Sequence, residues 1–440
     1  MRRALIAVFL GSPTAALAHA AEGGFVLLLP TDLYIAGGGV VVALTVGLLA
    51  LAPSWRPERL FRPFPVAPGL PGGWRPWTQG AALAVLLAMI WSGFQGATDP
   101  LRNPMTLGLW TVFWIALVTV QALAFDIWRW INPFAALARL VPGRRRARVS
   151  GWVAVALFLA FSGFLLADPA PSDPRRLAVF AVLYLGLTLL ALAVFGPRWL
   201  IRGEVFTVLM RTYRRTAAAG GGALGVNGWR ILRFGVPGLP LAVFILILLG
   251  SGSFDGLNET FWWFGILGIN PLEFPGRSAI VAPTLAGLLA VNAGLILAYG
   301  LSIRLGLSLA GGGVDFALAF RVFAPSILPI AAGYHVAHYL TSFLIDGQHV
   351  VSLLSSATGL GERQVTTGFL NRLDTVRAVW LAQAGAVVLG HVIAILTAHA
   401  LALRVFPDPR RATLSQLPLA LFMVGYTVFG LWLLAAPKGA

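Results

Sequence analysis

Two histidines three residues apart form the clearest chemical pattern in this 440-residue chain. His335 and His338 lie inside a long apolar stretch, in the segment Gly333–Tyr339. On a helix this spacing puts both imidazoles on one face, with Cβ atoms about 5–6 Å apart. Two such imidazoles could share a divalent transition metal, Zn or Cu, or ligate haem. A proton relay, contact with a substrate and simple packing are the alternatives.

Two further histidines lie in a later apolar stretch. His391 is near its middle and His399 comes eight residues later, a rise of about 12 Å along a helix, so these two cannot hold one ion. Consecutive helices often pack as antiparallel neighbours, which would bring His391 toward His335 and His338. We therefore predict that His335, His338 and His391 point into the helix bundle and form one site. We predict His399 to be a packed side chain.

Two carboxylates lie among aromatic residues in the segment 253–277. Asp255 and Glu259 are four residues apart, so a helix would present both on one face. We predict that they line a cavity beneath a lid or re-entrant segment and act as acid–base groups. An aromatic belt at the level of the lipid headgroups is the alternative.

Composition indicates the elements that carry these residues. Hydrophobic residues make up 58% of the chain and charged residues 11%, and the mean hydropathy is +0.83, which excludes an ordinary soluble domain. The sequence predicts an all-α polytopic membrane protein with about ten transmembrane helices. The predicted spans are 34–51, 78–96, 105–125, 150–167, 177–196, 236–252, 279–303, 316–344, 375–404 and 414–435.

The first 20 residues have the pattern of a secretory signal peptide. A basic start at Arg2 and Arg3 is followed by a short apolar run and by small residues suited to cleavage after Ala18 or Ala20. An uncleaved anchor is the alternative. Residues 21–440 then form a single transmembrane domain.

Charge between the spans predicts their orientation. With a cleaved signal, 22 of the 32 Lys and Arg residues fall in alternate gaps that become cytoplasmic, and eight fall in the others. We therefore expect a bacterial inner-membrane protein with both mature ends extracytoplasmic. The basic loops are expected to contact anionic membrane lipid rather than nucleic acid. Because the chain has no cysteine, disulfides, thiolate nucleophiles and Cys-ligated clusters are excluded.

One cytoplasmic gap, near 198–234, is longer than a turn. Apolar residues at helical spacing alternate there with arginines, which predicts an amphipathic helix lying at the membrane interface. The glycine run 220–222 that follows has no Gly-Lys-Ser/Thr, so it does not have the pattern of a phosphate-binding loop.

Three segments resemble a known family. They read Arg-Gly-Glu-Val-Phe-Thr-Val from Arg202, Ser-Phe-Asp-Gly from Ser253, and Ala-Gly-Tyr-His-Val-Ala-His-Tyr from Ala332 followed by Asp-Gly-Gln. The chain resembles, from its first residues to at least Gln348, the bacterial multi-pass membrane proteins called fenitrothion hydrolases. The resemblance implies a membrane subunit that hydrolyses a phosphorothioate triester.

Metal-dependent hydrolysis is chemically compatible with the candidate residues. A metal held by His335 and His338, with His391 as a further ligand, could activate water against phosphorus. Asp255 or Glu259 would then act as the base. Two other hypotheses stand beside this one: a transporter or carrier of metal or haem, and an accessory subunit that works with a second membrane subunit. A small-molecule substrate fits the hydrolase and the transporter hypotheses.

Overall fold

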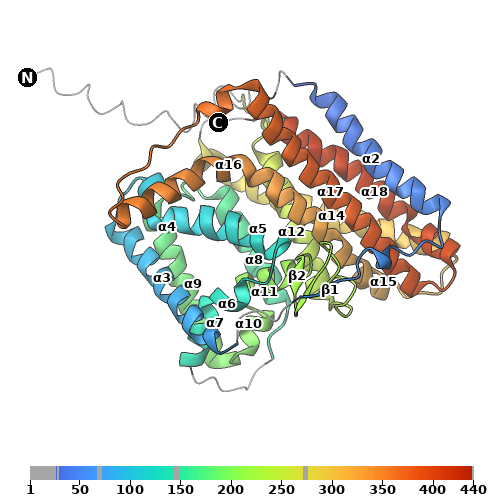
Figure 1. Ribbon diagram of the computed structural model, residues 1–440, viewed down its shortest axis with the longest axis horizontal. Helices are drawn as coiled ribbons and strands as arrows, with labels where there is room; N and C mark the ends of the chain where they lie inside the picture. The colour runs from blue at the N-terminus through green and yellow to red at the C-terminus, as the bar shows by residue number, and fades with distance from the viewer. Residues whose placement is uncertain (1–25, 27–28, 67–71, 142–147, 271–275, 439–440) are drawn as a thin grey trace, which may run out of the picture.

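The computed structural model describes residues 26, 29–66, 72–141, 148–270 and 276–438, and it is mostly helical (Figure 1). Nine helices of this described part are long and apolar enough to cross a membrane, and a tenth apolar helix, Trp152–Ala167, is shorter. By helix length and hydropathy the chain is thus a multi-pass membrane protein. The predicted signal peptide lies outside the described residues.

Each predicted span coincides with one of these ten apolar helices, although most of the helices extend beyond the predicted bounds at one end or both. The longest difference is at the eighth, which continues to Ala357 rather than ending near 344. The helices are α2 (Thr31–Leu51), α3 (Arg75–Gln95), α4 with η4 and α5 (Pro104–Leu123), α8 (Trp152–Ala167), α9 (Pro174–Phe195), α12 (Leu239–Asn258), α14 (Val281–Leu309), α15 (Phe316–Phe323) with η7 (Ala324–Ile327) and α16 (Leu328–Ala357), α17 (Leu373–Val405) and α18 (Pro409–Ala435).

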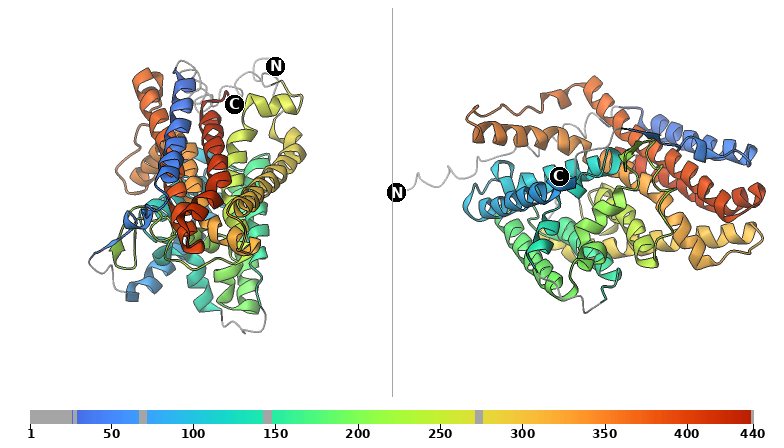
Figure 2. Two further views of the ribbon diagram at one scale, coloured as in Figure 1. Left: turned by 90° about the vertical axis from the view of Figure 1, so that its right-hand side faces the viewer. Right: turned by 60° about the horizontal axis from the view of Figure 1, so that its bottom comes forward.

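The spans are arranged in two groups joined by central helices. Helices α2, α14, α17 and α18 pack together on one side, and α3 packs against α9 on the other (Figures 1 and 2). Helix α12 contacts α8, α14 and α16, while α16 contacts both α17 and η4. The most deeply buried of the spans are those containing α12 and α16. Asp255 on α12 and His335 on α16 are therefore buried among neighbouring helices rather than exposed to lipid.

Glycine allows α16 and α17 to meet backbone to backbone. A Cβ at Gly333 would lie 2.4 Å from the carbonyl oxygen of Ala386, and one at Gly390 would lie 2.6 Å from that of Pro329. Small residues permit such close approach between membrane helices. This contact fixes the depth of α16, which carries His335 and His338.

An unusual helix faces α16 from the other side. Residues Leu107–Leu117, labelled η4, form an 11-residue π-helix between α4 (Pro104–Thr106) and α5 (Val118–Leu123). Helices of this type are rare and occur mostly as single turns, often at functional sites. Trp114, on this segment, projects toward α16.

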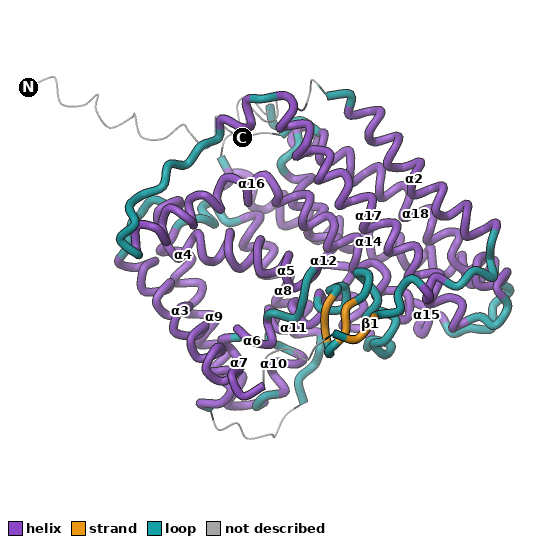
Figure 3. Tube along the Cα trace, viewed as in Figure 1, coloured by secondary structure: helices purple, strands orange, loops and turns teal. Residues whose placement is uncertain are grey.

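The segment 198–234 differs from its prediction. It contains α10 (Arg198–Arg202), α11 (Val205–Tyr213) and two strands, β2 (Ala219–Gly220) and β3 (Ala223–Leu224). Strand β3 lies between β2 and β1 (Phe64–Pro65) in a small antiparallel sheet (Figure 3). Eight of the nine residues of α11 are buried. The helix packs against α5, α6 (Trp128–Ile131) and α8 inside the protein instead of lying along a lipid surface.

A buried carboxylate explains why α11 begins where it does. Glu204 accepts hydrogen bonds from the backbone N–H groups of Phe206 and Thr207, and the Tyr184 hydroxyl donates to the same carboxylate. Carboxylates are favoured at helix N-termini because they accept from unpaired N–H groups and complement the helix dipole.

The acidic and aromatic segment 253–277, which lies between the predicted spans 236–252 and 279–303, is partly helical. Helix α12 continues to Asn258, whose side chain donates to the carbonyl oxygens of Phe254 and Asp255 near the helix end. A short helix, α13 (Phe261–Ile266), follows and is capped by Thr260. Asp255 thus belongs to a membrane-spanning helix. Residues 271–275 of this segment lie outside the described residues.

Candidate functional site

Asp255 and His338 form a buried pair between α12 and α16. Oδ2 of Asp255 lies 3.1 Å from Nε2 of His338, and the two side chains are only 11% and 8% exposed. The Tyr339 hydroxyl donates to the same carboxylate oxygen. An ionisable residue within a membrane span is costly unless it is paired. Here the Asp255 carboxylate is paired with the His338 imidazole and with the Tyr339 phenol.

Aromatic rings enclose the pair. Tyr334 stacks on His338 with ring centres 5.8 Å apart, and Tyr339 meets His338 edge-on at 4.7 Å. Tyr339 also meets His335 edge-on at 4.9 Å. These rings hold the two imidazoles in fixed orientations and exclude bulk water from them.

His335 lies beside the pair but makes different contacts. Its ring centre is 5.6 Å from that of Trp114 on η4 and 6.4 Å from that of Tyr213 on α11. The side chain is buried, and Nε2 finds no hydrogen-bond partner among the described residues. An imidazole nitrogen in this situation is available for a water, a proton or a ligand.

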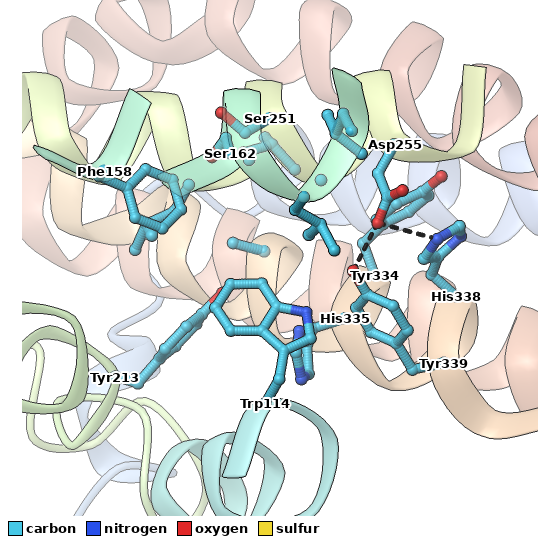
Figure 4. Close-up of a pocket in the computed structure, with 16 residues that line it drawn as sticks. Trp114, Phe158, Ser162, Tyr213, Ser251, Asp255, Tyr334, His335, His338 and Tyr339 are labelled. Carbon is cyan, nitrogen blue, oxygen red and sulfur yellow. Dashed lines mark hydrogen bonds and ion pairs between the residues drawn. The ribbon is translucent and has the colours of Figure 1, made fainter. Parts of the chain in front are cut away.

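A small cavity joins these side chains. Its volume of about 30 Å³ gives room for one or two waters. Asp255, His335 and His338 all face it, as Figure 4 shows. The cavity is lined by Trp114, Phe158, Ser162, Leu165, Leu166, Tyr213, Leu248, Leu249, Ser251, Gly252, Asp255, Ala331, Tyr334, His335, His338 and Tyr339.

His391 is buried on α17 but does not line this cavity. Its Nδ1 lies 2.9 Å from the carbonyl oxygen of Val387, one helical turn earlier. The ring faces Tyr426 at 6.4 Å, and the hydroxyl of Tyr426 shares a 2.6 Å hydrogen bond with Ser253. His391 thus packs beside Tyr426 of α18, and its Nε2 has no hydrogen-bond partner among the described residues. Across the described residues, no group of three or more His, Asp and Glu side chains is placed to hold a metal ion.

Glu259 is placed apart from Asp255. It is the C-cap residue that follows α12, its side chain is 48% exposed, and its carboxylate lies 3.5 Å from Nζ of Lys438. The two carboxylates therefore do not face the cavity together, although the sequence predicted them on one face. His399 is buried near the C-terminal end of α17, as a packed side chain would be.

Several residues of the site were not predicted. Tyr334 and Tyr339 flank the two histidines in the sequence Tyr-His-Val-Ala-His-Tyr, and helical spacing could have indicated them. Trp114 and Tyr213 come from segments that precede the two histidines by more than 100 residues. No local pattern distinguishes them from other aromatic residues of the chain.

The chain has no match among protein-family models, curated proteins or solved structures.

Proposed function

We propose that the protein is a proton-coupled membrane protein, and that Asp255 and His338 form its intramembrane proton-binding site. The observation that carries this proposal is the contact of 3.1 Å between a carboxylate and an imidazole, both about nine-tenths buried, on adjoining spans. Carboxylates and histidines inside membrane spans typically mark proton or ion pathways in pumps and transporters.

Charge accounting explains what one proton would do at this pair. With a carboxylate and a neutral imidazole the pair has a net charge of −1, and one added proton makes it neutral. In a medium of low dielectric constant this change alters the free energy of the surrounding helices far more than it would in water. The Tyr339 hydroxyl favours the charged carboxylate, and the cavity supplies space for a water that could deliver the proton.

Proton flux in reconstituted vesicles tests the proposal. Vesicles that contain the purified protein and an internal pH dye are given an inward pH gradient, and a potassium ionophore balances the charge. We expect proton uptake faster than in protein-free vesicles, and a loss of this uptake in both Asp255→Asn and His338→Gln. Glu259→Gln is the matched control, because Glu259 is half exposed and outside the cavity. Equal uptake by Asp255→Asn and the parent protein would refute the assignment.

Hydrolysis of a phosphorothioate triester, which the family resemblance implies, stays a prediction. The cavity beside His335 and His338 has room for water but is too small for a triester, so hydrolysis at this place would require the helices to separate. Release of the phenol from such a substrate by the purified protein, with and without added Zn²⁺ or Cu²⁺, measures this activity directly.

A location in a bacterial inner membrane, with both mature ends extracytoplasmic, is also part of the proposal. The positive-inside distribution of the Lys and Arg residues supports it. In that orientation α16 runs outward, and Asp255 and His338 lie in the outer half of the membrane.

A further inference from the structure

Four arginines gather where α11 ends. Arg211 is in the last turn of α11, Arg214 and Arg215 follow directly, and Arg230 comes from the turn after the small sheet. We refer to these four residues as the arginine cluster. It lies outside the cavity described above and takes no part in the proposed proton site.

One phenyl ring lies among three of the four arginines of the cluster. The guanidinium carbons of Arg214, Arg215 and Arg230 lie 5.3, 4.6 and 5.8 Å from the ring centre of Phe234. Each distance falls within the range of a cation–π contact. Three guanidinium groups are thus held around a single side chain, closer together than mutual repulsion would favour.

Negative charge in the described residues balances only part of this cluster. Arg214 pairs with Asp126 at 3.4 Å, and the other oxygen of that carboxylate accepts a hydrogen bond from Gln121. Burial, together with Arg214 and Arg211, lowers the pKa of Arg215 to about 10. Burial and Arg214 lower the pKa values of Arg211 and Arg230 as well. A nearby anion would relieve this repulsion.

Two buried donors of the cluster lack acceptors. Nε of Arg214 and Nη1 of Arg215 are shielded from solvent and have no hydrogen-bond partner among the described residues. A buried charged donor without an acceptor is strongly unfavourable. These donors therefore point to an acceptor that the described residues do not supply.

The cluster is also held in position before any ligand arrives. Nη1 of Arg230 donates to the carbonyl oxygen of Ala219 at 3.3 Å, and the same guanidinium covers Gly220. A Cβ at Gly220 would lie 2.1 Å from this nitrogen, so a larger residue there would displace the guanidinium. Preorganised donors bind an anion without a large ordering cost.

We propose that the arginine cluster is a binding site for a phosphate group. Guanidinium groups form paired hydrogen bonds with phosphate oxygens, and phosphate offers more acceptor positions than a carboxylate. The phosphate could belong to the headgroup of an anionic phospholipid or to a free ion, because both present the same oxygens. This proposal is independent of the proton-coupled function.

Binding measurements on the full-length protein distinguish the two sources. In one arm, protein in a neutral detergent is titrated with inorganic phosphate at constant ionic strength. In the other, it is placed in nanodiscs of phosphatidylcholine with increasing phosphatidylglycerol. The midpoint of thermal unfolding is read in both arms. A rise with phosphate alone identifies a free-ion site, and a rise with phosphatidylglycerol alone identifies a lipid site.

Arg215→Gln should reduce the apparent affinity at least tenfold, and Arg215→Lys should reduce it less because the charge remains. Arg202→Gln is the matched control, since Arg202 is exposed and outside the cluster. If Arg215→Gln does not fold, the apparent affinity of Arg215→Lys is compared with that of Arg202→Gln instead. The proposal is overturned if neither titrant raises the midpoint, or if Arg202→Gln weakens binding as much as the Arg215 variants.

Discussion

The Asp255 carboxylate receives hydrogen bonds from two side chains, and the one from Tyr339 can be removed without changing the size of the ring. Tyr339→Phe should destabilise the protein by about 1.5 to 3 kcal/mol, the usual contribution of a hydrogen bond to a charged group. Thermal unfolding in detergent measures this change. Tyr34→Phe is the control, because the Tyr34 hydroxyl makes no hydrogen bond within the described residues. Equal stability of Tyr339→Phe and the parent would show that the bond contributes nothing.

Glu204 gives a pH-dependent prediction. Burial raises the pKa of this carboxyl above its ordinary value of 4.5, against the opposing effect of its hydrogen bonds with Thr207 and Tyr184. The folded state therefore holds a proton to higher pH than the unfolded state does. Stability from this group is full below pH 4.5 and falls as the pH rises toward the folded pKa.

We expect the unfolding midpoint of the parent to fall relative to that of Glu204→Gln as the pH rises through this range. The difference between the two curves isolates Glu204 from the other acids. Glu362→Gln, whose side chain is 70% exposed, should instead run parallel to the parent. A constant difference between Glu204→Gln and the parent across the range would contradict the assigned direction.

At the level of single residues, the sequence predicted part of the site. The i, i+3 spacing places His335 and His338 at one cavity, and Asp255 joins them there. The sequence could not predict that Asp255 pairs with His338 or that His391 faces Tyr426. Those contacts depend on how α12, α16, α17 and α18 are rotated about their axes, and apolar helices carry little periodic pattern that would reveal their rotation.

Helix contacts give the next prediction, at Gly333 and Gly390. Alanine at either position would place a methyl group within 2.4 to 2.6 Å of a carbonyl oxygen of the opposing helix. We expect Gly333→Ala and Gly390→Ala to lower stability by about 1–3 kcal/mol or more, since overpacking forces backbones apart. Gly385→Ala is the control on α17, because a Cβ there meets nothing within 4 Å. Unfolding midpoints unchanged by all three would disprove the close contact.

Helix positions were predicted better than helix ends. Apolar length alone indicated the ten apolar helices of the described residues, because a span must present an apolar stretch long enough to cross the bilayer. The end of α12 was missed because Asp255 and Asn258 look like loop residues, yet Asn258 satisfies carbonyl groups at the helix end. The burial of α11 was missed because an amphipathic pattern is the same whether the apolar face meets lipid or protein.

For the whole molecule, the absence of cysteine makes topology directly measurable. Helix α8 has 16 residues, about 24 Å in length against a hydrocarbon core of about 30 Å. We nevertheless expect α8 to span, because the alternation of charge requires it. Single cysteines at Ser150 and Ala170, both exposed, should react with an impermeant maleimide from opposite sides of the membrane.

The cysteine-free parent should remain unlabelled in that experiment. The proposed orientation further requires the cysteine at Ala170 to react from outside intact cells and the one at Ser150 only after the membrane is opened. Labelling of both from the same side would mean that α8 does not cross, and the number of crossings would become odd.

The π-helix η4 makes the chain sensitive to length as well as to composition. Each of its hydrogen bonds closes over one residue more than in an α-helix, so loss of a single residue would let the segment close as an α-helix. If the segment instead kept its π-helical bonds after the loss, everything beyond the deletion would turn around the helix axis by somewhat less than the about 100° of one α-helical residue. Trp114 would leave the edge of His335, although every remaining residue would still suit a lipid environment. Apolar substitutions should thus be tolerated in this segment far more readily than deletions or insertions.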